Sequence, residues 1–215
     1  MKPLFYGMAW ADNIYKHAGV IPVVFIDSYV LPSLYKYYHP DVQTTGFNTI
    51  NYRRNHFTIS DDEIRLNNKR VYVEVGKKID ISDFSIEGLY TNTYLHLVDS
   101  FKAVNALKIK WANVVKHGKP GEEIQAFLTL RNTAKEIITD PALAISYTFY
   151  RTRKDKITSP PAFINEKEFM PGGEIERGIP LRLPLKRGKY RLVFSVNYYP
   201  FEGTLASDYY NVIVD

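Results

Sequence analysis

The chain has 215 residues, of which 45% are hydrophobic and 24% are charged, and it contains 17 tyrosines and no cysteine. This length and composition suit one large core or two small ones and argue against an intrinsically disordered chain. The lack of cysteine excludes disulfide bonds and thiolate metal sites.

The net charge of +5 is unevenly distributed along the chain. Residues 1–105 hold 11 basic and 11 acidic side chains, whereas residues 106–215 hold 17 and 12. This asymmetry predicts two modules and an acidic partner for the second one. A solvated basic face is the plainer interpretation of the same counts.

Targeting segments are not apparent in the N-terminal region. The segment up to Trp10 is too short and too aromatic for the apolar region of a signal peptide. The apolar residues 20–31 are interrupted by Pro22 and Asp27 and fall well short of the ~20 residues that span a bilayer. We therefore expect no transmembrane segment and no signal peptide, which places the protein in the cytoplasm or in an assembled virion.

Residues 1–104 are expected to form a β-rich N-terminal domain. A short helical turn after Asp12 ends at Gly19, and residues 20–30 read as a strand buried on both faces. Residues 35–40 fit one helical turn or an aromatic loop. Three alternating runs within residues 56–75, separated by turn residues, predict a β-meander. Two further short strands are expected within residues 79–86 and 89–98.

Residues 105–215 have the pattern of an immunoglobulin-like or jelly-roll-like antiparallel sandwich. Alternating apolar runs occupy residues 107–115, 124–132, 144–150 and 209–214. Within residues 181–196, a turn at Gly188 precedes Tyr190, and Leu192, Phe194 and Val196 then share one face. A tyrosine at the start of a strand after a glycine turn predicts a tyrosine corner, in which the phenol hydroxyl bonds the main chain.

A family resemblance rests on this C-terminal region. The turn at residues 118–123, the strand that ends in Leu130-Arg131-Asn132, and the later Gly188-Lys189-Tyr190 resemble a CARDB-type immunoglobulin-like domain. The resemblance covers about residues 105–215 and implies a seven-stranded sandwich used as an adhesion or accessory module. It implies no catalytic residues. A long loop after Asn132 and the inserted residues 158–170 depart from the family pattern.

Catalytic, metal and cofactor sites are not expected. The five histidines lack the spacing of a helical zinc pair, and the acidic run 61–63 lacks the spacing of a calcium loop. The glycine-rich residues 172–178 lack the Lys-Ser/Thr of a phosphate-binding loop. The sequence shows neither a serine nucleophile elbow nor a recognisable carboxylate pair. We therefore predict a protein without enzymatic activity.

Basic and aromatic residues form the candidate interface. Residues 151–156 combine with residues 186–189 in one basic patch, and residues 52–56 form another. Such patches bind acidic proteins or, alternatively, nucleic acid. The interface is predicted to be centred on aromatic side chains with basic loops at its rim. Its candidate residues are Tyr198, Tyr199, Phe201, Arg151, Arg153 and Lys154.

The sequence thus predicts two β modules in tandem with a structural or adaptor role in a larger homo- or hetero-oligomeric assembly. A virion component, such as a capsid vertex, turret or tail protein, is one concrete form of this role. The alternative is an accessory module that binds carbohydrate or a cell surface. These expectations rest on analogy between folds, and a fold does not by itself define a function.

Overall fold

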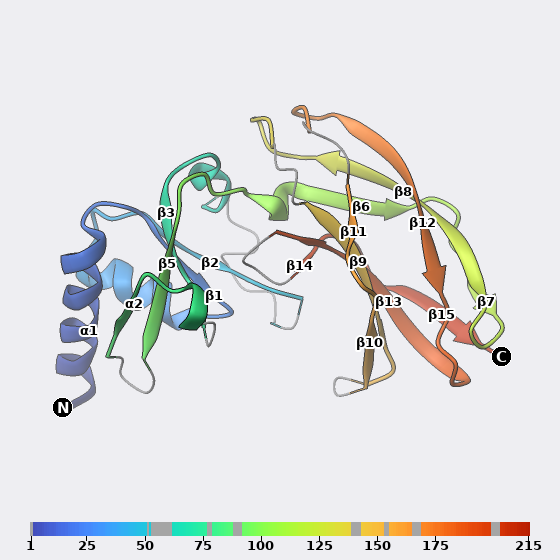
Figure 1. The fold of residues 1–215 in the computed structure, drawn as a ribbon, viewed down its shortest axis with the longest axis horizontal. Helices are drawn as coiled ribbons and strands as arrows, with labels where there is room; N and C mark the ends of the chain where they lie inside the picture. The colour runs from blue at the N-terminus through green and yellow to red at the C-terminus, as the bar shows by residue number, and fades with distance from the viewer. Residues whose placement is uncertain are drawn as a thin grey trace. The chain divides into compact units, whose positions relative to one another are not determined.

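A computed structural model describes residues 2–50, 52, 62–76, 79–87, 92–138, 143–152, 155–164, 169–198 and 203–215, with main chain only for residues 2–6 and 79. The chain is mainly β, as the sequence predicts (Figure 1). It divides into two compact units, Met1–Ala103 and Val104–Asp215. This division falls one residue before the expected boundary, and the two units are called unit 1 and unit 2 below.

The sheet of unit 1 has the strand order β2-β1-β3-β5-β4. Strands β2, β1 and β3 are parallel, whereas β5 pairs antiparallel with β3 and β4 pairs antiparallel with β5. Parallel neighbours need a crossover connection, which α2 supplies between β1 and β2. The bounds are β1 (Val23–Ile26), α2 (Val30–Tyr38), β2 (Thr44–Phe47), β3 (Val71–Glu74), β4 (Phe84–Ile86) and β5 (Thr93–Val98).

A helical layer packs on this sheet (Figure 1). Helix α1 (Lys2–Ala18) contributes Trp10 and Ile14 to a buried core that also holds Tyr35 of α2 and Phe25 of β1. Gly19 follows α1 with a φ of +59°, a left-handed conformation that suits the end of a helix. The sequence analysis predicted a β-rich domain with only short helical turns here, so this layer corrects that prediction. Neither helix in the described part of the chain has the length and apolar character that crossing a membrane requires.

The predicted β-meander within residues 56–75 is wrong. Its second run forms a 3-10 helix, η1 (Ile64–Leu66), and its first run lies outside the described residues. The third run is β3, which pairs with β1 and β5 rather than with the preceding residues. A second 3-10 helix, η2 (Ile79–Ile81), precedes β4 where a continuous strand was expected. Pairing with distant strands has overridden the local alternation.

Unit 2 is a sandwich of two sheets. One has the order β10-β9-β13-β15-β7, with β11 on β9 and β14 on β13, and the other has the order β12-β8-β6. All the pairs are antiparallel except β15 with β7, which is parallel. The elements are η3 (Val104–Ala106), β6 (Leu107–Trp111), β7 (His117–Gly118), β8 (Glu123–Asn132), β9 (Ala144–Tyr150), β10 (Lys156–Thr158), β11 (Ala162–Phe163), β12 (Glu174–Arg182), β13 (Gly188–Asn197), β14 (Thr204–Leu205) and β15 (Tyr210–Val214).

Aromatic side chains join the two sheets of the sandwich. Trp111 of β6 packs edge-on against Phe194 of β13, with ring centroids 5.9 Å apart, and Phe194 also contacts Tyr210 of β15. Trp111 and Phe194 are fully buried. Strand β13 is the central strand of its sheet, because β9 and β15 pair with it on either side. It therefore provides a rigid base for the side chains on its outer face.

Candidate interaction site

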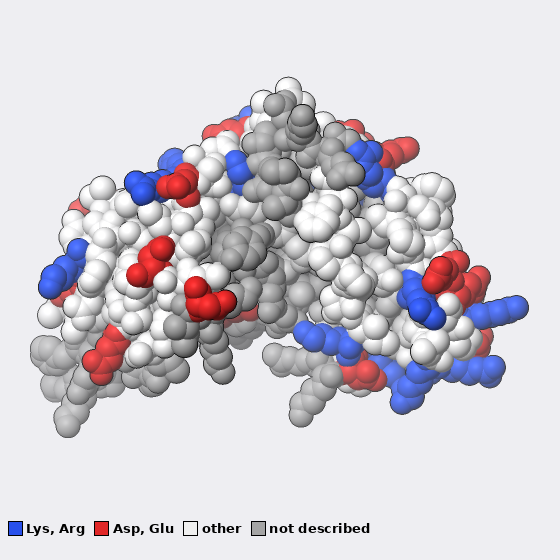
Figure 2. All heavy atoms as spheres, in the orientation of Figure 1, with Lys and Arg blue, Asp and Glu red and all other residues white. Residues whose placement is uncertain are grey.

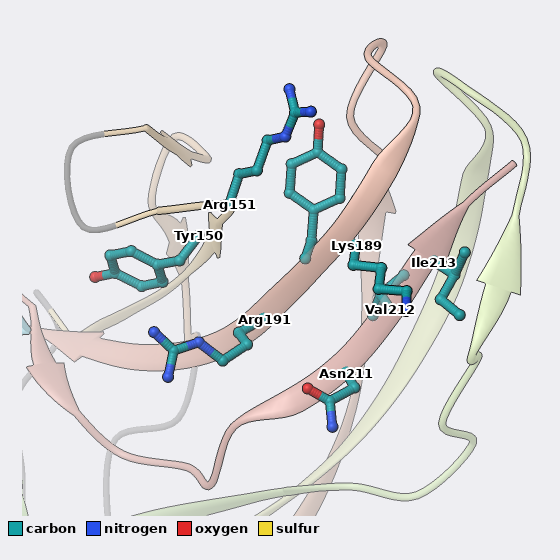
Figure 3. A pocket seen from close by; sticks show the side chains of 8 residues that line it. Tyr150, Arg151, Lys189, Arg191, Asn211, Val212 and Ile213 are labelled. Atoms are coloured by element: carbon teal, nitrogen blue, oxygen red, sulfur yellow. The ribbon is translucent and has the colours of Figure 1, made fainter.

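A cavity of about 430 Å³ opens on unit 2 where β9, β13 and β15 lie side by side (Figure 3). The pairing of the strands sets its composition, because Tyr150, Arg191 and Asn211 are register partners across the three strands. Lys189 and Ile213 form the next row. The lining residues are Tyr150, Arg151, Lys189, Tyr190, Arg191, Asn211, Val212 and Ile213.

The strand alternation separates these residues into two faces. Tyr190 and Val212 are buried toward the sandwich core, whereas Lys189, Arg191 and Asn211 are exposed. Partners in an antiparallel register project to the same side of a sheet, so Tyr150 and Ile213 share the outer side with them. We call the outer side at Tyr150, Lys189, Arg191, Asn211 and Ile213, together with Arg151 beside it, the basic face.

The cations of the basic face lack acidic partners in the described part of the chain. Arg151, Lys189 and Arg191 are exposed, and none forms an ion pair with a described carboxylate. Figure 2 shows lysine and arginine side chains gathered at the lower right, over the end of unit 2 where β10, β13 and β7 lie in Figure 1. Acidic side chains also lie in this part of the surface, but none of those that the structure describes pairs with Arg151, Lys189 or Arg191.

Aromatic rings hold Arg191 in place. Its guanidinium carbon lies 5.2 Å from the centroid of the Tyr209 ring, a cation–π arrangement. The rings of Tyr150 and Tyr209 pack edge to face with centroids 6.4 Å apart. These contacts orient the Arg191 guanidinium without neutralising its charge.

Tyr150 has an unsatisfied hydroxyl. The oxygen is buried and has no hydrogen-bond partner among the described residues. Burial raises the pKa of this phenol, the neighbouring Tyr209 raises it further, and Arg191 opposes both effects. The group therefore remains protonated at neutral pH and can donate a hydrogen bond.

Tyr190, which lines the cavity, closes the turn before β13. The Tyr190 hydroxyl donates a hydrogen bond of 2.7 Å to the carbonyl oxygen of Lys186, four residues upstream. This is the bond that defines a tyrosine corner. Gly188 has a φ of +149°, a conformation that residues with a side chain rarely adopt, and its ideal Cβ position lies 3.6 Å from Nε of Arg151. Arg151, the first residue of one basic run, thus lies beside Gly188 of the other.

The structure places the predicted interface residues in different environments. Arg151 lines the cavity, whereas Arg153, Lys154, Tyr199 and Phe201 lie outside the described residues. Tyr198 is buried, with 4% of its surface exposed, so the exposure expected of it is not met. The reason is its position directly after β13, whose residues 192–196 are all buried.

The sequence analysis missed four residues of this region. Tyr150, Arg191, Asn211 and the neighbouring Tyr209 come from three segments that only strand pairing brings together. The alternation of Lys189 and Arg191 with the buried Tyr190 and Leu192 was visible in the sequence. It indicated two cations on one face, but not their neighbours.

Carboxylates gather in unit 1 at the ends of the parallel strands, where α/β proteins often bind ligands. The Asp27 carboxylate accepts hydrogen bonds of 2.7 Å from both the main-chain N–H and the hydroxyl of Thr49. Oε1 of Glu74 accepts the N–H of Gly76 at 2.8 Å. Both groups thus bind the protein's own chain. Among the described residues, no three His, Asp or Glu side chains are grouped closely enough to hold a metal ion.

A second cavity of about 430 Å³ lies in unit 1 beside α2 and β2. Its Lys36 amine donates to the main-chain carbonyls of Pro40 and Val42, and Arg65 pairs with Asp62 at 3.7 Å. These two cations are already bound to carbonyl or carboxylate oxygens, whereas those of the basic face have no described carboxylate partner. The cavity in unit 2 is therefore the stronger candidate.

Comparisons with known proteins give weak and partial likenesses. No family model and no curated protein matches the chain significantly. Spo0M, a sporulation control protein from Bacillus subtilis, is 15% identical with a TM-score of 0.35, and the match covers 51% of this chain and 49% of Spo0M. This chain therefore matches about half the length of Spo0M.

Two further solved structures show likenesses of similar size. The CARDB domain of PF1109 from Pyrococcus furiosus is 12% identical with a TM-score of 0.34, and the match covers 51% of this chain and 92% of that domain. The alkylpurine DNA glycosylase AlkC from Pseudomonas fluorescens is 14% identical with a TM-score of 0.37, covering 51% of this chain and 30% of AlkC. The chain thus has a weak, partial similarity to a CARDB domain, and these likenesses carry no information about its activity.

Proposed function

We propose that the protein is a non-enzymatic adaptor of a larger assembly, and that it binds an acidic partner protein through the basic face of unit 2. The observation that carries this proposal is the set of three cations, Arg151, Lys189 and Arg191, around one cavity without a described carboxylate partner. Complementary charge gives specificity and rapid association to such an interface.

The composition of the face supports a protein ligand. Arginine and tyrosine are enriched at protein interfaces, because they offer large, well-ordered contact areas with polar ends. The net charge of the chain is +5, which favours a different, acidic protein over a second copy as the ligand of this face. A role in a virion stays a prediction, since neither the described residues nor the matching proteins bear on it.

The experiment that tests the proposal is a binding titration with a dye-labelled, glutamate-rich peptide. The full chain carries the double substitution Lys189→Ser and Arg191→Ser, and fluorescence anisotropy is measured at about 50 mM and 300 mM salt. We expect the double variant to bind about tenfold more weakly at the lower salt, because two exposed charge pairs are lost. Added salt should reduce the difference through screening.

The matched control is the double substitution Lys110→Ser and Arg182→Ser. These two side chains are also exposed and lie on the other sheet of the sandwich, on β6 and β12. The net charge changes by the same amount, so the control variant should keep most of the affinity. Equal losses in the two variants would show that binding follows net charge alone and would contradict a defined site.

A further inference from the structure

The cations of the basic face do not converge on one point. Figure 3 shows three side chains extending in different directions: Arg191 and Lys189 from β13, and Arg151 from the residue after β9. A single small anion cannot contact all three. The charges instead form an extended surface, which suits a ligand that carries several negative groups along its length.

The spacing of two cations matches an extended peptide. Lys189 and Arg191 lie two residues apart on β13 and on the same face, so their Cα atoms are separated by about 6.6–6.8 Å. Every second side chain of an extended peptide repeats at the same distance. Carboxylates at alternate positions can therefore meet these two cations in register when the flexible side chain of Lys189 turns toward Arg191.

The main chain of β13 cannot take part in recognition by adding a strand. Strands β9 and β15 already pair with it on its two sides. A ligand must lie over the face and be recognised by side chains. Asn211 beside Arg191 provides an amide, and Ile213 beside Lys189 provides an apolar contact.

The tyrosine rings at this face are poorly placed for stacking nucleic-acid bases. Arg191 already lies over the ring of Tyr209, and Tyr150 meets Tyr209 edge to face. Single-stranded nucleic acids need open aromatic faces on which successive bases stack. The geometry therefore favours carboxylates on a peptide over phosphates on a nucleic acid.

We infer that the ligand of the basic face is an extended acidic segment of the partner protein, with carboxylates at every second residue, lying along β13. This inference rests on the proposed function and specifies the charge pattern of the partner. Recognition through two or three exposed ion pairs implies modest affinity and strong salt dependence.

Two dye-labelled peptides of equal composition test the inference with the full-length protein. One alternates five glutamates with five threonines, and the other places the five glutamates in one block. At about 50 mM salt we expect the alternating peptide to bind about fivefold more tightly, because both pairs then form in register. If binding depended on charge attraction alone, the peptide with the five glutamates in one block would bind more tightly, because its local charge density is higher. Lys189→Gln and Arg191→Gln should each abolish the preference, whereas Arg182→Gln should keep it.

The contrary outcomes are separable. Equal binding of both peptides, weakened by Lys189→Gln, overturns the inferred pattern and leaves the acidic-partner proposal standing. Absence of binding by either peptide overturns the proposed function itself. Tighter binding of a ten-nucleotide oligothymidine than of either peptide, again weakened by Arg191→Gln, overturns both in favour of a nucleic-acid ligand.

Discussion

The two units use their charged side chains in different ways. In unit 1, Asp27, Glu74 and Lys36 bind main-chain or side-chain groups of the same unit, and His39 pairs with Asp12 at 3.1 Å. In unit 2, the cations around the cavity have no described acidic partner. These charged groups of unit 1 thus hold their own unit together. In unit 2, Arg131 pairs with Glu174 at 3.7 Å, but the cations around the cavity remain available for binding. Net charge alone would not have revealed this difference.

The largest expected effect concerns the separate cores. Phe194→Ala removes a fully buried ring from the contact between the two sheets of unit 2 and should destabilise that unit by about 3–5 kcal/mol. Both described α-helices lie in unit 1. In denaturant unfolding, we therefore expect the transition reported by Trp111 fluorescence in a Trp10→Phe background to move, while the helical circular dichroism remains.

The control for this prediction is Phe25→Ala in the core of unit 1. It should move the helical transition and leave the Trp111 transition in place, because Phe25 packs against Trp10 and Tyr35. If both transitions move together in both variants, the two units unfold as one cooperative structure. The comparison between them would then concern surfaces only and not independent folding units.

A smaller effect is expected at the corner beside the basic face. Tyr190→Phe removes the hydroxyl that donates to Lys186 and should cost unit 2 about 1–2 kcal/mol while preserving the fold. Tyr209→Phe is the matched control, because its ring is 47% exposed and its change should stay within about 0.5 kcal/mol. Chemical denaturation measures both. Equal stabilities of the Tyr190 variant and the wild type would show that the corner bond contributes nothing.

The sequence predicts more of the structure of unit 2 than of unit 1. The strands of unit 2 follow from alternation, as in β8, where Ala126, Leu128 and Leu130 are buried together. In β13, however, Val193 and Ser195 are also buried, so this strand is covered on both faces where alternation indicated one. The pattern identifies a strand, but not what covers its second face.

The helices of unit 1 were predicted only as short helical turns, for identifiable reasons. In α1, the buried residues Trp10, Ile14 and Ala18 follow helical spacing, but the helical turn was predicted to begin only after Asp12. In α2, the helical turn was expected only from residue 35 onward, although Pro32 is the third residue of the helix. A proline in the first turn removes no helical hydrogen bond. Its position relative to the start of the helix could not be known from the sequence.

The candidate site was predicted in part. The basic runs around Arg151 and Gly188 were visible in the sequence, because they are local. Their aromatic neighbours required the pairing of β9 with β13 and the position of Tyr209 beside β15. Contacts between residues far apart in sequence depend on strand order and register, which alternation alone does not determine.

The smallest expected effect tests how unit 1 uses its carboxylates. Burial raises the pKa of Glu74 above its ordinary value of 4.5, the N–H groups of Gly76 and Ile26 lower it, and nearby Asp27 raises it. The folded state therefore holds this proton more tightly than the unfolded state. The resulting contribution to stability is fully present below pH 4.5 and is lost as the pH rises through the folded-state pKa. Glu74→Gln keeps the oxygen that accepts the N–H of Gly76 and removes the titration.

We therefore expect the stability of Glu74→Gln relative to the wild type to increase as the pH rises from 4.5 toward neutrality. Urea unfolding of both proteins at several pH values measures the difference. Glu176→Gln is the control, since this exposed carboxylate lies on β12 of unit 2 and its variant should follow the wild-type profile. A difference that stays constant with pH, or decreases, would mean that Glu74 is charged in the folded state and stabilised by its neighbours. The main-chain N–H groups of Gly76 and Ile26 would then outweigh burial and the nearby Asp27, and the expected rise in the pKa of Glu74 would be wrong.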